Sequence, residues 1–267
     1  MFGRRPDGTL VRDTSPMRRF MPFVSPRRNE SLVYFAQEID VEAALAFVEA
    51  RNATRPAERP MTLFQLVLRA IARGLQDRPR MNRFVAGGRL WQRNDVWMTF
   101  SAKKRLDDQA PVVTVKRRFD PAESLDEMIE GTLGRLREGR SDKKSTSDLE
   151  MGALLRLPPF VIRAVMWLVH RIDQLGLLPN AMIEPDPLFT SAFIANLGSV
   201  GLEAAYHHLW ERGNCPIFCV VGRIHPGADG RRRIVLKWTF DERTEDGFYA
   251  ARALDLVRER LENPEKL

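Results

Sequence analysis

The chain has 267 residues, of which 44% are hydrophobic and 29% are charged, and its formal net charge at pH 7 is +7. A chain of this length and apolar content can bury a large core, and its composition excludes intrinsic disorder beyond the chain ends. The opening residues, MFGRRPDGTLVRD, lack the apolar segment of a secretory signal peptide, so we expect a cytoplasmic location.

Basic residues gather in two segments. Residues 1–30 hold seven arginines, and we expect them to form a basic N-terminal arm ahead of a single domain over 31–267. The second group comprises Lys103, Lys104, Arg105, Lys116, Arg117 and Arg118. Such groups attract nucleic acid, anionic lipid or a phosphorylated cofactor, or form a solvated face. No RNA-binding motif, zinc finger or helix-turn-helix signature accompanies them, so nucleic acid is the least favoured partner.

The two cysteines, Cys215 and Cys219, lie in the apolar run PIFCVVG and just before it. If both belong to one strand, their four-residue offset places them on one face about 13 Å apart, too far for a disulfide. No further cysteine is present to complete a zinc site. We therefore expect two buried thiols, a reducing compartment and no metal.

Patterns of apolar residues predict one mixed α/β domain without a glycine-rich phosphate loop. A strand over 31–39 leads to a helix capped by Asp40 and ending near Asn52. Thr62 caps a second helix, and a capping box of Ser124 and Glu127 opens a third. Further strands are predicted over 95–102, 111–117, 188–196, 216–222 and 232–240, and a closing helix over 247–261.

The segment 155–179, LRLPPFVIRAVMWLVHRIDQLGLLP, predicts an apolar helix that begins near two prolines. Its charged residues, Arg163 and Arg171 among them, make it too polar and too short to span a bilayer. The wide apolar face predicts burial against its own domain or a neighbouring subunit. The alternative is docking onto a membrane surface, with the basic arm as a second attractor.

The C-terminal segment WTFDERTEDGFYAARALDLVRERLENPEKL resembles the C-terminus of the acyltransferase subunits of 2-oxoacid dehydrogenase complexes. In that family a strand runs into a D-H-R-x-x-D-G turn that is followed by a helix, and chloramphenicol acetyltransferase shares the turn as H-x-x-x-D-G. Other segments are similar in the same order: PMRRFM, EIDVEAALAFVEARN, MTLFQLVLRAIARGLQDRPRMNRF, APVVTVKRRFDPAESLDEMI, FIANLGSVG and CPIFCVVGRI. The resemblance covers about residues 16–265.

This resemblance implies a two-layer α/β sandwich of the CoA-dependent acyltransferase type, assembled as a homotrimer with active sites between subunits. It implies acyl-CoA as a substrate, and the basic group around Lys103 and Lys116 could meet the CoA phosphates. Only a short stretch precedes the matching segment, so we expect a stand-alone form without a lipoyl domain. The segment 155–179 would then be a helical insertion.

The residues that carry out the reaction in this family are replaced in this chain, while the residues that form its turn are kept. Asp241, Arg243, Asp246 and Gly247 keep the turn, and Asp246 is expected to help hold it, as in the family. Glu242 stands where the family has its catalytic histidine, and Ala195 stands where it has the serine that binds the oxyanion. A carboxylate is a weaker base than imidazole unless an apolar pocket raises its pKa.

Two hypotheses follow. In the first, the protein transfers an acyl group from CoA or another thioester, with Glu242, His207 or His208 as base and Asn196 or backbone amides as oxyanion donors. In the second, the protein is an inactive trimer that binds acyl-CoA, a membrane or a partner complex. Glu242 would then form salt bridges in a subunit interface, and the two histidines would be ordinary surface residues.

Overall fold

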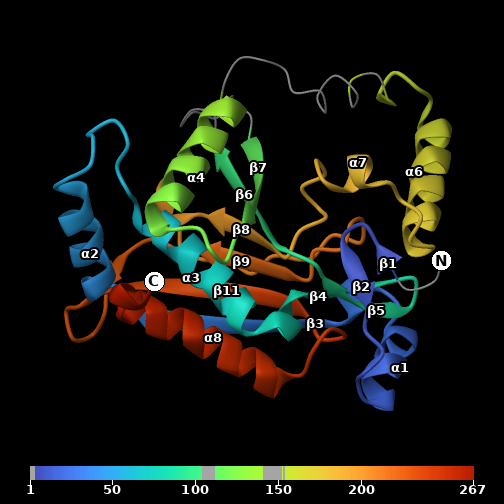
Figure 1. Cartoon of the computed structure of the whole chain (residues 1–267), viewed down its shortest axis with the longest axis horizontal. Coiled ribbons are helices and arrows are strands. Elements are labelled where there is room, and N and C mark those ends of the chain that lie inside the picture. The colour runs from blue at the N-terminus through green and yellow to red at the C-terminus, as the bar shows by residue number, and fades with distance from the viewer. Residues whose placement is uncertain (1–3, 104–111, 141–151, 153) are drawn as a thin grey trace.

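The computed structural model describes residues 4–103, 112–140, 152 and 154–267 of the chain. A mixed sheet lies against a layer of helices, with a smaller sheet beside one end (Figure 1). The expected two-layer α/β fold is confirmed. Of the stretch expected as a basic arm, residues 4–10 form two short strands and residues 16–24 form a helix.

The large sheet has seven strands, and β11 pairs with β3 on one side and β9 on the other, in the order β3-β11-β9-β8-β6-β7, while β10 joins one end of β11. The strands are β3 (Leu32–Asp40), β6 (Val96–Lys103), β7 (Val112–Phe119), β8 (Ala192–Asn196), β9 (Ile217–Val221), β10 (His225–Pro226) and β11 (Arg232–Asp241). The pairs β6·β8 and β8·β9 are parallel, and the remaining pairs are antiparallel. The small sheet contains β1 (Arg4–Arg5), β2 (Gly8–Leu10), β4 (Arg83–Ala86) and β5 (Arg89–Arg93).

The helices of the described residues are α1 (Pro16–Val24), α2 (Glu42–Asn52), α3 (Leu63–Asp77), α4 (Leu125–Arg140), α6 (Pro159–Gln174), α7 (Asn180–Ile183) and α8 (Gly247–Glu262). Short 3-10 turns occur at Arg28–Glu30, Pro79–Asn82, Gly198–Val200 and Pro264–Lys266. Figure 1 shows α3 and α8 across one face of the large sheet, and α6 standing apart at one end.

Local sequence signals start two of these helices. The Thr62 side chain accepts the Gln65 N–H while Gln65 accepts the Thr62 N–H, which completes a capping box at the start of α3. Ser124 and Glu127 make the same exchange before α4. The caps predicted at Thr62 and Ser124 are confirmed, and each satisfies backbone donors that a helix end leaves open. The cap predicted at Asp40 was wrong by one residue: Val41 holds the N-cap position of α2, although the Asp40 carboxylate accepts the Glu42 N–H at 3.0 Å.

Alternate residues of β11 divide the core into two clusters. Leu236, Trp238 and Phe240 belong to the cluster between the sheet and the helices, whereas Val235 packs on the opposite face. The cluster on that opposite face is built around Phe193, Phe218 and the loop 201–216. The sheet therefore has a helix face and a loop face.

The two cysteines are buried and unpaired, but the prediction that they share a face was wrong. Cys219 lies in β9 and packs in the helix-face cluster, while Cys215 belongs to the loop-face cluster. The reason is that β9 begins at Ile217, after Pro216, so the alternation of the strand does not extend back to Cys215.

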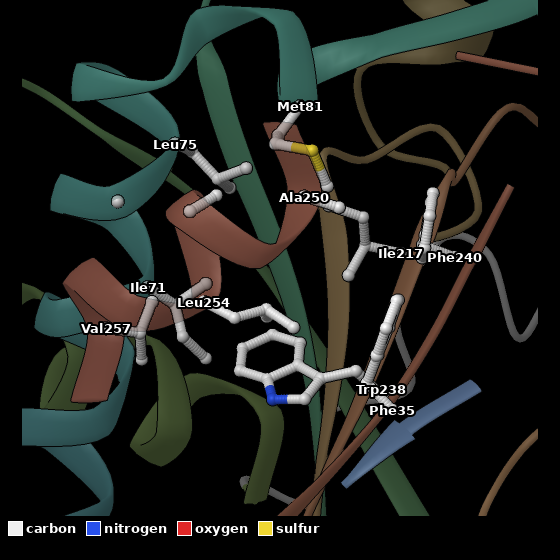
Figure 2. Close-up of a pocket in the computed structure, with 12 residues that line it drawn as sticks. Phe35, Ile71, Leu75, Met81, Ile217, Trp238, Phe240, Ala250, Leu254 and Val257 are labelled. Carbon is white, nitrogen blue, oxygen red and sulfur yellow. The ribbon is translucent and has the colours of Figure 1, made fainter. Parts of the chain in front are cut away.

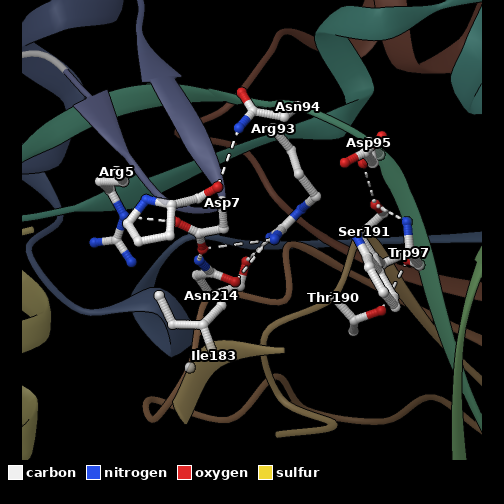
Figure 3. Close-up of polar contacts among 12 residues, drawn as sticks. Arg5, Asp7, Arg93, Asn94, Asp95, Trp97, Ile183, Thr190, Ser191 and Asn214 are labelled. Atoms are coloured by element: carbon white, nitrogen blue, oxygen red, sulfur yellow. Dashed lines mark hydrogen bonds and ion pairs between the residues drawn. The ribbon is translucent and has the colours of Figure 1, made fainter. Parts of the chain in front are cut away.

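The small sheet was not predicted from the sequence. Its β4–β5 hairpin turns through Gly87 and Gly88, which have φ of 60° and 67° and so take the left-handed conformation that favours glycine. A buried polar network joins this sheet to the rest of the chain (Figure 3). Asn214 donates to Asp7 at 2.6 Å and accepts from Arg93 at 2.7 Å.

The same network anchors one end of α6. Arg5 donates to the Asp7 carboxylate at 2.9 Å and to the Asp173 carboxylate at 2.6 Å. The predicted helix within 155–179 is confirmed, but its burial against its own domain is not, because Trp167 and Leu168 are 59% and 52% exposed. Within the described part of the chain, no helix is long and apolar enough to cross a membrane.

Candidate functional site

The acidic turn after β11 is held by a buried ion pair. Arg243 donates through Nε and Nη2 to the two carboxylate oxygens of Asp241, at 2.8 and 2.7 Å. Its Nη1 donates to the carbonyl oxygens of Ser25 and Pro26. Bidentate pairing of this kind fixes geometry as well as charge. Arg243 therefore faces Asp241 and not Glu242.

A second buried guanidinium, that of Arg28, ties this turn to the loop 201–216. Its Nε lies 3.8 Å from the Asp241 carboxylate, and it donates to the carbonyl oxygens of Trp210 and Gly213. Burial lowers the pKa of Arg28, while the Asp241 carboxylate opposes that shift. Arg28 therefore links the acidic turn to the loop 201–216 through contacts with both segments.

Glu242 itself is exposed at the tip of the turn. Its N–H donates to the Ser31 carbonyl at 2.9 Å, and its own carbonyl accepts from Arg18 at 2.6 Å. Among the described residues, its carboxylate has no hydrogen-bond or ion-pair partner. The apolar pocket that would make Glu242 a stronger base is therefore not formed by the described residues of its own chain.

Asp246 is the N-cap residue of α8. Its carboxylate accepts the Tyr249 N–H at 2.9 Å and so caps α8. This hydrogen bond lowers the pKa of Asp246 despite partial desolvation. Arg18 lies 3.9 Å from the same carboxylate. Asp246 thus shapes the turn rather than facing a cavity.

Asn196 and Glu242 lie at opposite ends of the sheet. Asn196 pairs with Val221, and Val221 pairs with Leu236. Glu242 follows Leu236 by about six residues, so at about 3.3 Å per residue the two candidates are about 20 Å apart. One chain cannot bring both of them to the same carbonyl group. The Asn196 side chain accepts the Ser199 N–H at 3.1 Å.

The loop face presents a half-buried histidine in a defined protonation state. The ring of His207 stacks on Phe218 at a centroid distance of 4.0 Å, and its Nδ1 lies 2.7 Å from the His208 carbonyl oxygen. A carbonyl only accepts, so Nδ1 carries the proton. Burial lowers the pKa of His207, which leaves Nε2 unprotonated at neutral pH. Among the described residues Nε2 has no hydrogen-bond partner.

His208 differs from its neighbour. Its side chain is exposed, and its ring lies 4.5 Å from that of His207 and 5.9 Å from Trp210. The structure therefore brings the two predicted histidines together, but only His207 is held by packing and by a hydrogen bond through its ring.

Ala195 lies on the same face of the sheet as His207, and Ser101 lies next to Ala195 on the neighbouring strand. Ala195 packs on the loop-face cluster, whereas its neighbour Ile194 belongs to the helix-face core. Ser101 pairs with Ala195 across the parallel strands, and its neighbour Phe100 also faces the helices. Alternation therefore places Ser101 and Ala195 on the loop face, about 5 Å apart. The sequence offered no signal for Ser101, because strand register is a long-range property.

Only part of the basic group that was expected to bind the CoA phosphates lies among the described residues. Lys104 and Arg105 lie outside the described residues, as does the side chain of Lys103. Lys116 donates through Nζ to the carbonyl oxygens of Ile183 and Asp186, at 2.9 and 3.0 Å. Burial, reinforced by the charge of Arg93, lowers the pKa of Lys116 to about 8. Lys116 is thus engaged within its own chain.

Arg117 is engaged in the same way, because it forms an ion pair with Glu123. Its guanidinium also lies 4.8 Å from the ring of Phe119. Neither Lys116 nor Arg117 is placed to reach a phosphate without breaking contacts inside the chain.

Two hollows in the molecule are poor candidates for the site. The first is an apolar cavity of about 30 Å³ between α3, α8 and the sheet, bordered by Trp238 and Leu75 (Figure 2). It has room for about one water molecule and no polar partner for it, so it is a packing gap. The second lies between α6 and the loop near Gly213. Its charged residues Asp173 and Arg212 are paired, and its third, Glu211, accepts the backbone N–H groups of Arg28 and Asn29.

No metal centre is indicated by the side chains. Within the described ranges, no three His, Cys, Asp or Glu residues are grouped closely enough to hold an ion. On the loop face, His207 offers a proton acceptor and Ser101 offers a hydroxyl. Ser101 pairs with Ala195 and Ala195 with Val220, two residues beyond the Phe218 on which His207 stacks, so the Cα atoms of Ser101 and Phe218 are about 12 Å apart.

Comparison with solved structures identifies the fold. The structure is similar to the Azotobacter vinelandii dihydrolipoamide acetyltransferase, with a TM-score of 0.62 and 18% identity over 96% of this chain and 93% of that one. It is also similar to the cubic core of the pyruvate dehydrogenase multienzyme complex, with a TM-score of 0.61 and 18% identity over 96% and 93%. A chloramphenicol acetyltransferase gives 0.60 and 11% over 96% and 98%.

No protein-family model matches the chain, and no curated protein sequence matches it. At these identities the structural similarity establishes the fold and not the reaction. The chain therefore has the fold of the dihydrolipoamide and chloramphenicol acetyltransferases, which confirms the resemblance seen in the sequence at the level of architecture.

Proposed function

We propose that the protein transfers an acyl group from CoA, or from another acyl thioester, to an acceptor nucleophile. The fold supports this class of reaction, because acetyltransferases share it over nearly the whole chain. The observation that carries the proposal is the neutral His207, whose Nδ1–H is held by a carbonyl and whose Nε2 has no partner among the described residues. This is the arrangement that a general base requires.

His207 is the better base of the two candidates. An imidazole that is neutral at pH 7 is well matched to a thiol with a pKa of about 8.5, whereas a solvated carboxylate is a weaker base. Glu242 lacks a pocket within the described residues of its own chain. In this proposal Nε2 of His207 takes the proton from the attacking thiol or hydroxyl as that atom bonds to the acyl carbon, and the CoA thiolate leaves.

Ser101 takes the part of the oxyanion donor. Ala195 has no side-chain donor, but the hydroxyl of Ser101 lies on the adjacent strand, about 5 Å from Ala195. A donor aimed at the developing oxyanion contributes about 3 to 4 kcal/mol in other acyl-transfer enzymes. Lys103 follows Ser101 on the same strand, and with Lys104 and Arg105 it remains the candidate for the CoA phosphates.

The assembly that we propose is a homotrimer with each site at a contact between copies. The similarity to the cubic core of the pyruvate dehydrogenase multienzyme complex supports an assembly of several copies. In such a trimer, the exposed Glu242 of one copy would lie beside the loop face of the next. A non-catalytic trimer that binds acyl-CoA is the second candidate, favoured by the replacement of the family's histidine and serine by Glu242 and Ala195.

The test is release of free thiol from short- and long-chain acyl-CoAs by the full chain, compared with variants. We expect His207→Gln to lower the rate by about 100-fold or more and Ser101→Ala by about the same factor, whereas Glu242→Gln has a small effect. His225→Gln is the matched control, because His225 lies in β10, outside the loop 201–216, and its ring lies 3.7 Å from the Glu38 carboxylate and 3.2 Å from the Pro226 carbonyl oxygen.

The two candidate functions give different results. Thiol release that depends on His207 supports acyl transfer. Calorimetric binding of acyl-CoA without release of free thiol from any donor supports the non-catalytic trimer and contradicts the proposed acyl transfer. Neither release nor binding would contradict both candidates.

A further inference from the structure

Two helices at one end of the molecule expose large apolar side chains. On α1 these are Met17, Phe20, Phe23 and Val24, which are between 55% and 66% exposed. On α6 and its flanks they include Phe160, Trp167, Leu168, Leu175 and Leu177, of which Phe160 is 72% exposed. On α1 they recur at intervals of three or four, and within α6 Phe160 and Trp167 are seven residues apart with Leu168 next to Trp167, so in each helix they share the solvent side.

The two helices belong to one continuous surface. The turn of the β4–β5 hairpin lies between them: a Cβ at Gly88 would meet the Phe23 ring at 3.3 Å, and the Gly87 N–H donates to Gln174 at the end of α6. Figure 1 shows α1 and α6 at the same end of the molecule, opposite the C-terminus. We call this surface the α1–α6 edge, formed by residues 12–24, 86–90 and 154–177.

The charges of the α1–α6 edge are almost all positive. Its exposed basic residues are Arg12, Arg19, Arg89, Arg156, Arg163 and Arg171. None of these six has an ion-pair partner among the described residues, whereas most other arginines of the described chain are paired. The exposed acidic residue of the edge is Asp13, and its other carboxylate, Asp173, is buried against Arg5.

The arrangement on α6 is that of an interfacial helix. Arg171 lies over the ring of Trp167, at 5.4 Å from its centroid, between the exposed apolar residues. Long basic side chains extend their charge toward lipid headgroups while their carbon chains and adjacent aromatic rings stay in the apolar boundary. The helix is too short and too polar to span, so it would lie in the plane of the surface.

We propose that the α1–α6 edge docks the protein onto the surface of an anionic lipid bilayer. A contact in which the edge meets itself in a second copy would bring the same unpaired arginines face to face, which the charge of the edge disfavours. A head-to-tail contact with another surface of a second copy is separated from lipid docking by the light-scattering test below. An anionic lipid surface satisfies both features, because headgroup phosphates pair with the arginines and the acyl boundary covers the apolar side chains. Docking would bring the acidic turn near the bilayer, because α1 also contacts it through Arg18.

Co-sedimentation of the full chain with vesicles tests the proposal. Vesicles of equal parts phosphatidylglycerol and phosphatidylcholine should sediment the protein, pure phosphatidylcholine vesicles should not, and high salt should weaken the binding. Arg163→Gln with Arg171→Gln should lower the partition coefficient roughly 30-fold, the equivalent of about 1 kcal/mol for each charge. Leu168→Ser should lower it roughly tenfold through lost apolar burial.

Matched controls lie far from the edge. Arg252→Gln with Arg258→Gln removes two exposed charges of α8, and Leu202→Ser changes a leucine that is 56% exposed, against 52% for Leu168. Both controls should bind vesicles as the unmodified protein does. Circular dichroism melting establishes that every variant is folded, since all these side chains are exposed.

Three results would overturn the proposal: no sedimentation with anionic vesicles, equal losses in edge and control variants, or a smaller mass by light scattering in Leu168→Ser. The last result would assign the edge to contact between copies. Vesicle binding is measured without acyl-CoA, so its outcome is independent of the proposed acyl transfer.

Discussion

Replacing Asp241 with asparagine removes the negative charge at the centre of the acidic turn. The carboxylate holds Arg243 through two hydrogen bonds of 2.7 and 2.8 Å and lies 3.8 Å from the Nε of Arg28. The side chains of Arg243 and Arg28 are only 3% and 5% exposed. The substitution would therefore leave two buried guanidinium groups without this countercharge.

The expected cost is large. Breaking a buried ion pair by removing one partner destabilises a protein by about 3 to 5 kcal/mol. This is a substantial part of a total stability of about 5 to 15 kcal/mol. With a urea m-value of about 3 kcal/mol/M, the midpoint should fall by about 1 M or more. The assay is urea unfolding at one fixed protein concentration, because assembly would make the midpoint depend on concentration.

Asp246→Asn is the matched control in the same turn. Its carboxylate is 54% exposed, and an asparagine caps a helix about as well as an aspartate does, so the change should stay within about 0.5 kcal/mol. A loss below about 1 kcal/mol for Asp241→Asn, or equal losses for the two variants, would refute the view that buried charge pairing holds the turn.

Two further predictions concern groups that surround the site. Burial lowers the pKa of Lys116 from 10.5 to about 8. Below pH 8 the folded protein must bury the charged ammonium group, which lowers its stability. This loss of stability disappears as the pH rises from about 8 to 10.5, because the folded protein then holds the neutral amine. The unfolding free energy of the protein relative to Lys116→Met should therefore rise by about 3 kcal/mol between about pH 7.5 and 10.5, and a constant difference would contradict the assignment. Gly213→Ala should destabilise by several kcal/mol more than Gly201→Ala: both have positive φ, but only at Gly213 does a Cβ meet backbone, at 2.4 Å from the Leu188 oxygen. Equal thermal melting of the two variants would refute the close contact.

Much of the fold could be predicted because its signals are local. The capping boxes at Thr62 and Ser124 and the apolar periods of the strands lie within a few residues of the elements they specify. The small sheet could not be predicted in this way. Its attachment depends on Arg5 reaching Asp173, a contact between residues 168 positions apart. No local pattern contains that information.

The candidate site shows the same division. The spacing of DERTEDG placed Glu242 on a turn, and the family resemblance placed Ala195 at the position of the family's serine. Strand register, which is set by long-range pairing, separates Asn196 from Glu242 and places Ser101 beside Ala195. Nothing near Lys116 in the sequence indicated its partners, whereas the fold brings two carbonyl groups to its ammonium.

The pH dependence of kcat/KM for thiol release tests the central claim most directly. Burial lowers the pKa of His207, so its base form persists to a lower pH than that of an ordinary histidine. The rate should fall on the acid side with a pKa below about 6.5, and His207→Gln should lose this limb together with about 100-fold or more of the rate. An unchanged acid limb and rate in His207→Gln, or loss of the limb in Glu242→Gln instead, would contradict the assignment of His207 as the base.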